Sequence, residues 1–226
     1  MTVAEALASR KSIRDFLPTP VPGDVIRRVL TLASRAPSGG NVQPWRIDVV
    51  AGTRLDELKA VMQRRLAEVA QGDHSEQPEY DIYPKELVSP HRDYRFKLGE
   101  DMYATMGISR EDKATRLRWF ARNFAFFGAP MALFCSLDRR MGPPQWSDLG
   151  MFLQSVMLLL REEGLDSCPQ ECWSVYPKTV GQFIGLPPER MLFCGMSIGH
   201  RNPDHPVNTL VADRAPLADF ANFHGC

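Results

Sequence analysis

The segment LGMFLQSVMLLL, running from Leu149 to Leu160, decides the fold class of this 226-residue chain. Its apolar residues recur at helical spacing and cover most of the circumference of the predicted helix: Leu149, Phe152, Leu153, Val156, Met157 and Leu160, extended by Met151, Leu158 and Leu159. A helix that is apolar on most sides is buried at the centre of a domain or of a dimer. Gly164 follows at a position where glycine commonly ends a helix.

Three segments with the pattern of strands lie before and after this helix. They are RIDVVA at 46–51, MALFCSL at 131–137 and MLFCGMSIGH at 191–200. A further helix is predicted between Ser109 and Phe124, with four apolar residues facing inward: Leu117, Phe120, Ala121 and Phe124. The chain has no repeat, no linker and no break in composition, which favours a single α+β domain over residues 1–226.

Residues 71–108 interrupt these patterns, because their apolar residues show no clear period. Six acidic residues lie between positions 73 and 95, and four tyrosines lie at 80, 83, 94 and 103. A segment this long without regular structure is usually functional or disordered. The tyrosines favour an ordered excursion from the domain, and we interpret it as a lid over the active site.

The charge balance excludes one large class of function. The 27 basic and 27 acidic residues give a formal net charge of zero. A nucleic-acid-binding protein needs surplus positive charge to displace counterions from phosphates, and a polybasic membrane patch needs the same surplus. We therefore expect neither nucleic acid nor membrane as a partner. The longest nearly apolar stretch, Phe124 to Cys135, is also too short for a membrane helix, and Pro130 interrupts it.

The five cysteines form no regular disulfide framework, which favours reduced thiols and a cytoplasmic protein. Cys168 and Cys172 with His200 and His205 fit no standard zinc spacing, so we expect no metal. Cys168 as a nucleophile has no evident base beside it.

A first motif with chemical meaning is the basic segment from Arg10 to Arg14. In an extended backbone Arg10, Ser12 and Arg14 point the same way, and Lys11 adds a further cation. Guanidinium groups around a hydroxyl suit a phosphate, since they can donate several charge-assisted hydrogen bonds to its oxygens. A solvated run of charges at a helix end is the alternative interpretation of these residues alone.

A second motif is the loop from Pro37 to Trp45, PSGGNVQPW. Adjacent glycines allow backbone N–H groups to approach a ligand closely, and Ser38, Asn41 and Gln43 add short polar groups without charge. The loop could bind the edge of a heterocycle or could simply connect a helix to a strand. Neither a dinucleotide-binding glycine motif nor a P-loop occurs in the chain.

Together these segments resemble the flavin-dependent nitroreductase family. The segment Gly164 to Glu171, GLDSCPQE, the pair Gly199–His200 and the segment Arg214 to Leu217 resemble its later motifs in the same order. The elements WSDLGMF (146–152) and FFGAP (126–130) are most similar to the branch that acts on nitrobenzoates.

The resemblance implies a central, mainly antiparallel sheet flanked by helices in an intertwined homodimer, with FMN between the subunits. Arg10 and Ser12 would hold the FMN phosphate with Arg214, and Arg14 would reach the ribityl chain and the pyrimidine edge. The partner subunit would contribute the loop, and Pro169, Gln170 and Glu171 would line the edge of the ring. The implied cofactor-binding residues are Arg10, Lys11, Ser12, Arg14, Pro37, Ser38, Gly39, Asn41, Pro169, Gln170, Glu171, Cys172, Gly199, His200 and Arg214.

Cys172 is a departure from the family, which commonly has a glycine whose N–H donates to flavin N5 at that position. The implied activity is NAD(P)H-dependent reduction of nitroaromatic compounds by ping-pong hydride transfer through flavin N5, with no certain catalytic side chain. Two alternatives remain open: a reductase of the same fold for quinones, activated alkenes or halogenated aromatics, and a flavin-binding protein without turnover.

Overall fold

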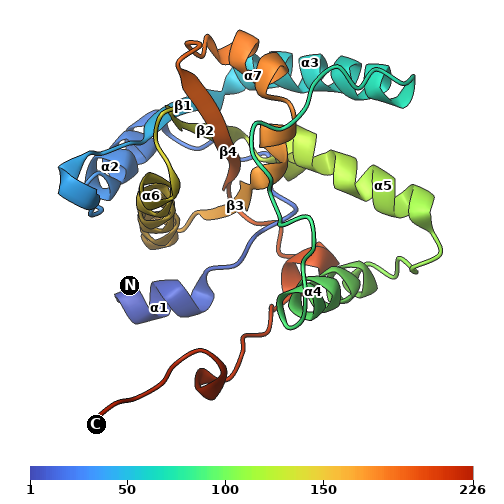
Figure 1. Ribbon diagram of the computed structural model, residues 1–226. Coiled ribbons are helices and arrows are strands. Elements are labelled where there is room, and N and C mark those ends of the chain that lie inside the picture. Colours follow the sequence, from blue (N-terminus) through green and yellow to red (C-terminus); the bar gives the residue numbers. More distant parts are fainter. Residues whose placement is uncertain (226) are drawn as a thin grey trace.

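The computed structural model describes residues 1–225, which fold into a four-stranded sheet between helices (Figure 1). The helices are α1 (Val3–Ser9), α2 (Gly23–Ala33), α3 (Gly52–Ala70), α4 (His91–Thr105), α5 (Lys113–Ala121), α6 (Pro143–Glu162) and α7 (Pro177–Ile184). The strands are β1 (Arg46–Ala51), β2 (Met131–Asp138), β3 (Asp166–Gln170) and β4 (Arg190–Gly199). Short 3-10 helices are η1 (Gly39–Asn41), η2 (Arg122–Gly128), η3 (Glu171–Val175), η4 (Pro206–Thr209) and η5 (Leu217–Asp219).

The strands are ordered β1-β2-β4-β3, and every neighbouring pair is antiparallel. The three strands expected from the sequence are therefore confirmed, and a fourth, β3, completes the sheet. Next to β3 the basic segment adds an isolated parallel bridge between Ser12 and Ser167. This bridge brings the chain's N-terminal region to the edge of the sheet.

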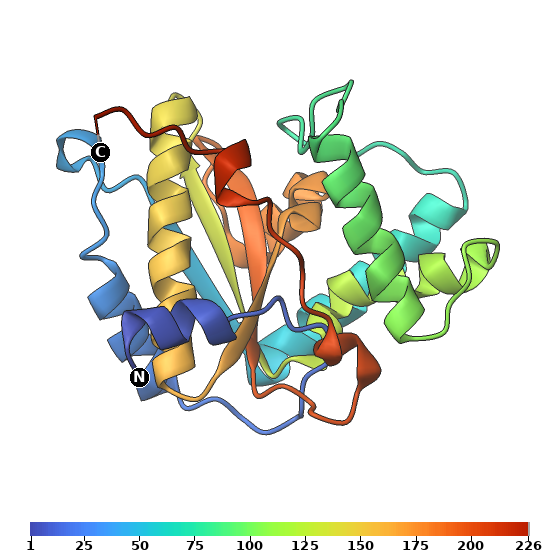
Figure 2. The same ribbon diagram turned by 90° about the horizontal axis from the view of Figure 1, so that it is seen from below.

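One face of the sheet is covered by α2 and α6. The central helix predicted from the sequence is α6, and Leu149, Val156 and Leu160 on it are completely buried. They pack on alternate residues of β2 and β4, such as Leu133 and Met196. Figure 2 shows α6 on one side of the sheet and α3 on the other.

The other face is covered by α3, α7 and the aromatic residues of η2 and η3. Phe126 stacks on Trp173 with 4.3 Å between ring centroids, and both side chains are fully buried. Gly195 of β4 lies beneath this pair, where a Cβ atom would come within 2.4 Å of the Trp173 ring. The aromatic layer therefore requires a glycine at that position of the strand.

The excursion is ordered and contains a helix that the sequence pattern did not predict. Helix α4 has no buried residue, so it carries no apolar stripe by which it could be recognised. Before α4, the chain passes over β4 (Figure 1). There the Tyr80 hydroxyl donates a hydrogen bond to the Phe193 carbonyl, and its ring packs against Trp146.

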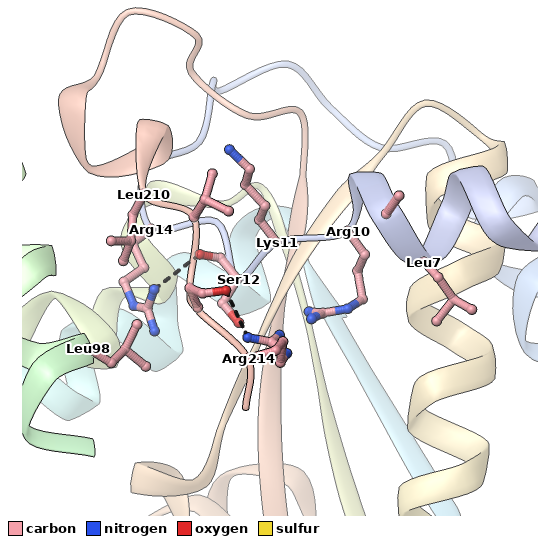
Figure 3. Close-up of a pocket in the computed structure, with 11 residues that line it drawn as sticks. Leu7, Arg10, Lys11, Ser12, Arg14, Leu98, Leu210 and Arg214 are labelled. Carbon is pink, nitrogen blue, oxygen red and sulfur yellow. Dashed lines mark hydrogen bonds between the residues drawn. The ribbon is translucent and has the colours of Figure 1, made fainter. Parts of the chain in front are cut away.

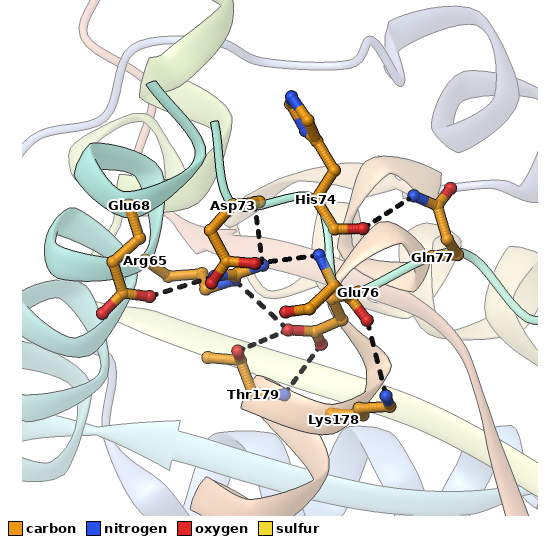
Figure 4. Close-up of polar contacts among 9 residues, drawn as sticks. Arg65, Glu68, Asp73, His74, Glu76, Gln77, Lys178 and Thr179 are labelled. Carbon is orange, nitrogen blue, oxygen red and sulfur yellow. Dashed lines mark hydrogen bonds and ion pairs between the residues drawn. The ribbon is translucent and has the colours of Figure 1, made fainter. Parts of the chain in front are cut away.

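Arg65 of α3 forms ion pairs with residues 73–76, at the beginning of the excursion (Figure 4). Its side chain is 8% exposed and lies 2.7 Å from the Asp73 carboxylate and 3.4 Å from that of Glu76. Glu76 also accepts hydrogen bonds from the backbone N–H and the hydroxyl of Thr179, in the first turn of α7. We call Arg65, Asp73, Glu76 and Thr179 the anchor cluster.

Helix α5 contradicts part of the sequence prediction. Asp112 caps its first turn, but Leu117 is 70% exposed and Phe120 is 48% exposed. Only Phe124, beyond the end of the helix, is buried among the core aromatics. The reason is that α5 projects from the domain, as Figure 1 shows, so its apolar residues meet no second layer in this chain. Among residues 1–225, no helix combines the length and the apolarity needed to cross a bilayer.

Candidate functional site

A cavity of about 270 Å³ opens at the edge of the sheet, where the segment at 7–14 lies near the segment at 210–214 (Figure 3). It is bordered by the end of α1, the basic segment, Leu98 of α4 and the segment after η4. Its lining residues are Leu7, Ala8, Arg10, Lys11, Ser12, Arg14, Leu98, Leu210, Val211, Ala212 and Arg214. The structure thus gathers all five residues that the sequence analysis assigned to the phosphate and its surroundings.

The extended backbone of the basic segment explains why these side chains share one cavity. Arg10 leaves α1 with extended dihedral angles, and the N–H of Ile13 donates to the Ser167 carbonyl at 3.0 Å. Ile13 is completely buried in the core, so its neighbours Ser12 and Arg14 face the opposite way. The predicted alternation of side chains is confirmed. Lys11 also borders the cavity, although its amino group points away from Arg10 and Arg214 in Figure 3.

The cavity is strongly cationic. Within residues 1–225, no carboxylate lies at ion-pair distance from Arg10, Lys11, Arg14 or Arg214. Arg14 donates to the Ser12 carbonyl at 3.2 Å, and Arg214 donates to two carbonyls of its own segment. Burial and the nearby Arg214 guanidinium lower the pKa of Arg10 from its ordinary value. Four cations held together without a counter-charge fit a dianionic ligand such as a phosphate monoester.

The loop at 37–41 lies outside this cavity. Gly40 and Asn41 both have positive φ, at 57° and 58°, so the backbone is tightly turned. The Gly39 N–H points to the buried carboxylate of Asp148 on α6, 3.3 Å from each oxygen. Pro37, Gly39 and Asn41 are exposed, and Ser38 is partly buried. Their assignment to the cofactor stays a prediction.

At the end of β3, the Gln170 side chain is not available to line a flavin ring. The Gln170 side chain turns into the core, where it donates to the Asn123 carbonyl at 2.8 Å and accepts from Ser197 at 2.7 Å. Only its backbone could face a ligand. Glu171 is exposed, and Pro169 and Cys172 are partly buried.

The thiols beside this site are poor nucleophiles. Burial raises the pKa of Cys168, against the opposing effect of Arg14 and Arg10, and raises that of Cys172 to about 12. Both thiols are protonated at neutral pH.

Gly199 and His200 lie apart from the cationic cavity. A Cβ atom at Gly199 would come within 2.7 Å of Pro130, so close packing alone requires this glycine. His200 borders a separate open hollow with Arg201, whose guanidinium pairs with the buried Asp166 at 2.6 Å. The cofactor contacts of Gly199 and His200 stay a prediction. Arg201, unlike the arginines of the cationic cavity, is paired with a carboxylate.

Two residues of this region were missed by the sequence analysis. Leu98 borders the cavity from α4, which has no apolar stripe, and Asn208 lies in a short polar segment between prolines. Nothing local in the sequence distinguishes either residue. Among the described residues, no group of three or more potential metal ligands occurs.

An antiparallel sheet between two helical layers, with a cationic cavity at its edge, defines a protein of the α+β class. The sequence model of the Nitroreductase family matches residues 7–200, and the chain belongs to this family. It is 35% identical to 4-nitrobenzoate reductase of Pseudomonas putida over 219 residues, covering 97% of this chain and 94% of the relative. It is 31% identical to chloronitrobenzene nitroreductase of Comamonas testosteroni, covering 98% and 96% of the two chains.

Solved structures agree with this assignment. The FMN and NADPH-dependent nitroreductase NfnB from Sphigopyxis sp. strain HMH matches with a TM-score of 0.95 and 46% identity, covering 100% of both chains. The FMN-dependent nitroreductase NfnB from Mycobacterium smegmatis, solved in complex with NADPH, matches with a TM-score of 0.92 and 28% identity, covering 98% of both chains. The predicted family and fold are confirmed.

Proposed function

We propose that this protein is an FMN-dependent NAD(P)H oxidoreductase that reduces nitroaromatic compounds, with nitrobenzoates as the favoured class. The observation that carries the proposal is the cationic cavity, whose Arg10, Lys11, Arg14 and Arg214 have no carboxylate partner among the described residues. The names of the relatives support the cofactor and the substrate class.

The donor set fits the phosphate of FMN. Arg10, Ser12 and Arg214 would bind the phosphate oxygens, and Arg14 would place positive charge beside the ring system. When bound, FMN supplies the hydride chemistry, accepting a hydride from NAD(P)H and passing reducing equivalents to the nitro group. The chain's own residues fix the cofactor's position and neutralise its charge. Each charge-assisted hydrogen bond to the phosphate contributes about 1.5–3 kcal/mol.

The proposal includes a homodimer in which each subunit completes the other's site. The loop at 37–41 lies outside the cavity of its own chain, as expected if it serves the partner's cofactor. Four apolar residues of the C-terminal segment, Val211, Leu217, Phe220 and Phe223, are 55–69% exposed in the single chain. A second copy would cover them. Within residues 1–225 four cysteines are free and three of these are buried, which favours the cytoplasm as the location.

The experiment is a flavin titration followed by anaerobic reduction. The purified protein should bind FMN, NADPH or NADH should bleach the flavin absorbance, and 4-nitrobenzoate should restore it. A protein that takes up no added FMN would refute the proposal. Bleaching without reoxidation by any acceptor would favour a flavin-binding protein without turnover. Quinone turnover faster than nitrobenzoate turnover would move the assignment to another branch of the family.

A further inference from the structure

Asn208 is a buried polar residue that joins the two ends of the chain. It lies in η4 and is 8% exposed. Its side-chain oxygen accepts from the Arg14 backbone N–H at 3.0 Å, across 194 positions of sequence. Its side-chain nitrogen donates to the Asp15 carbonyl at 2.8 Å and to the Asn202 carbonyl at 2.9 Å.

These three hydrogen bonds use one acceptor and two donors of a single amide group. Among residues of this size, only asparagine offers an acceptor together with two donors, since a threonine hydroxyl has a single donor. Leucine offers neither, and aspartate offers no donor at neutral pH. The three partners are backbone atoms, so Asn208 fixes where the main chain runs rather than where one side chain points.

Asn208 lies between two segments that border the cavity, so its hydrogen bonds affect how these segments are placed. On one side it holds Arg14, the last residue of the basic segment. On the other side the chain continues from Asn208 directly into Leu210, Val211, Ala212 and Arg214, which border the same cavity. Asn202 donates from its own side chain to the Asp15 carboxylate at 2.9 Å, which also pairs with Arg122.

The cavity's cations repel one another, so the arrangement needs a restraint. Burial lowers the pKa of Arg10, and the nearby Arg214 guanidinium lowers it further because the two positive charges lie close together. The bonds within the two segments, Arg14 to Ser12 and Arg214 to Ala212 and Asp213, do not connect one segment to the other. Asn208 does connect them.

We propose that Asn208 is a positioning residue that assembles the phosphate cavity from the N-terminal and C-terminal segments before the ligand binds. This inference rests on the proposed function, because it treats the cavity as the FMN phosphate site. Asn208 itself borders no part of the cavity and would not touch the ligand. It lies outside residues 7–200, the part of the chain matched by the family.

The test compares Asn208→Leu with Val207→Ala, a control at the adjacent buried position. Val207 is 2% exposed, so its truncation also loosens η4, but its side chain makes no polar contact. Asn208→Leu should raise the Kd of FMN about tenfold or more, and Val207→Ala should change it less than about threefold. At saturating FMN, Asn208→Leu should recover turnover close to that of the wild type, since the affected step is assembly of the site. Equal Kd values for Asn208→Leu and the wild type would overturn the inference.

A second measurement tests the inference without flavin. Amide hydrogen exchange in the wild-type protein should show the Arg14 N–H protected, because its acceptor is the buried Asn208 oxygen. In Asn208→Leu that single amide should exchange faster, while the Ile13 N–H, bonded to Ser167, stays protected. An Arg14 N–H that exchanges as fast as a fully exposed amide in the wild type would contradict the inference. If the wild type binds no FMN but the Arg14 N–H is protected, the proposed function fails, while the inference that Asn208 joins the two segments is supported.

Discussion

At the scale of single residues, the cavity lined by Arg10, Arg14 and Arg214 is a cluster of like charges brought together by the fold. Figure 3 shows the Arg10 and Arg214 guanidinium groups pointing toward each other from opposite segments. In the chain without a ligand this proximity is unfavourable, and a bound dianion converts it into attraction. The residues are thus arranged for binding at some cost in stability.

Substituting Arg214 tests this balance. Arg214→Ala should weaken FMN binding about 10- to 100-fold, the loss expected for one charge-assisted hydrogen-bonding side chain. Without FMN the same variant should melt at the same temperature as the wild type or slightly higher, because repulsion of Arg10 is relieved. A flavin titration and a melting curve without flavin measure the two effects.

The matched control is Arg27→Ala on α2. Arg27 is exposed and makes no ion pair among the described residues. Its removal should leave FMN affinity unchanged. Equal FMN retention in the two variants would contradict the assignment of Arg214.

At the scale of elements, the anchor cluster decides which part of the excursion is fixed. It binds residues 73–76 to both α3 and α7 (Figure 4), and Tyr80 packs against α6 and β4. Beyond Tyr80 the chain is mostly exposed up to α4. We therefore expect the movement of the predicted lid to involve residues 81–108 and not the anchored residues 73–80.

The anchor cluster predicts a pH dependence of stability. Hydrogen bonds from Ser75 and the ion pair with Arg65 hold the pKa of Asp73 well below its ordinary value. A carboxyl whose pKa is lower in the folded than in the unfolded state stabilises the fold above about pH 4, and this contribution is lost as pH falls further. Asp73→Asn should therefore be less stable than the wild type near neutral pH, and the difference should shrink between about pH 5 and pH 2.

Urea unfolding at a series of pH values measures this difference. Asp81→Asn is the control, since Asp81 is an exposed carboxylate of the same excursion with no ion pair in the described structure. Its stability should follow that of the wild type at each pH. A constant difference between Asp73→Asn and the wild type over the whole series would show that the charge of Asp73 contributes nothing.

At the scale of the whole molecule, the single chain leaves apolar surface that a second copy would cover. The segment after η4 runs along the outside of the domain in Figure 2, with Phe220 and Phe223 exposed by 69% and 65%. Large apolar side chains on an extended segment are typical of an arm that packs on a partner.

Sedimentation of the wild type should give twice the mass of the chain. The double variant Phe220→Ser and Phe223→Ser should raise the dimer dissociation constant at least about tenfold, because burial of each phenylalanine contributes about 1.5–3 kcal/mol. Val88→Ser removes a similarly exposed apolar side chain, 63% exposed, from the excursion and should leave the dimer intact. A monomeric wild type would exclude the shared site.

Much of the fold was determined by local sequence pattern. The short strand-like segments at 46–51, 131–137 and 191–200 and the broad apolar stripe of 149–160 identify three strands and the central helix, because these patterns report burial of each element. The basic segment likewise predicted that Arg10, Ser12 and Arg14 lie together, since an extended backbone fixes the common direction of alternate side chains, and they do border one cavity. Where burial is absent, as in α4, or where a helix projects from the domain, as in α5, the same reasoning failed.

The tertiary structure alone decided which distant residues meet. It joined the Arg10–Arg14 segment to Arg214, turned the Gln170 side chain into the core, and gave Arg201 a partner in Asp166. It also placed Asn208 against the backbone of Arg14. The physical reason is that a periodic pattern records whether a side chain is buried, while the identity of its partner depends on contacts between segments that lie up to 194 positions apart.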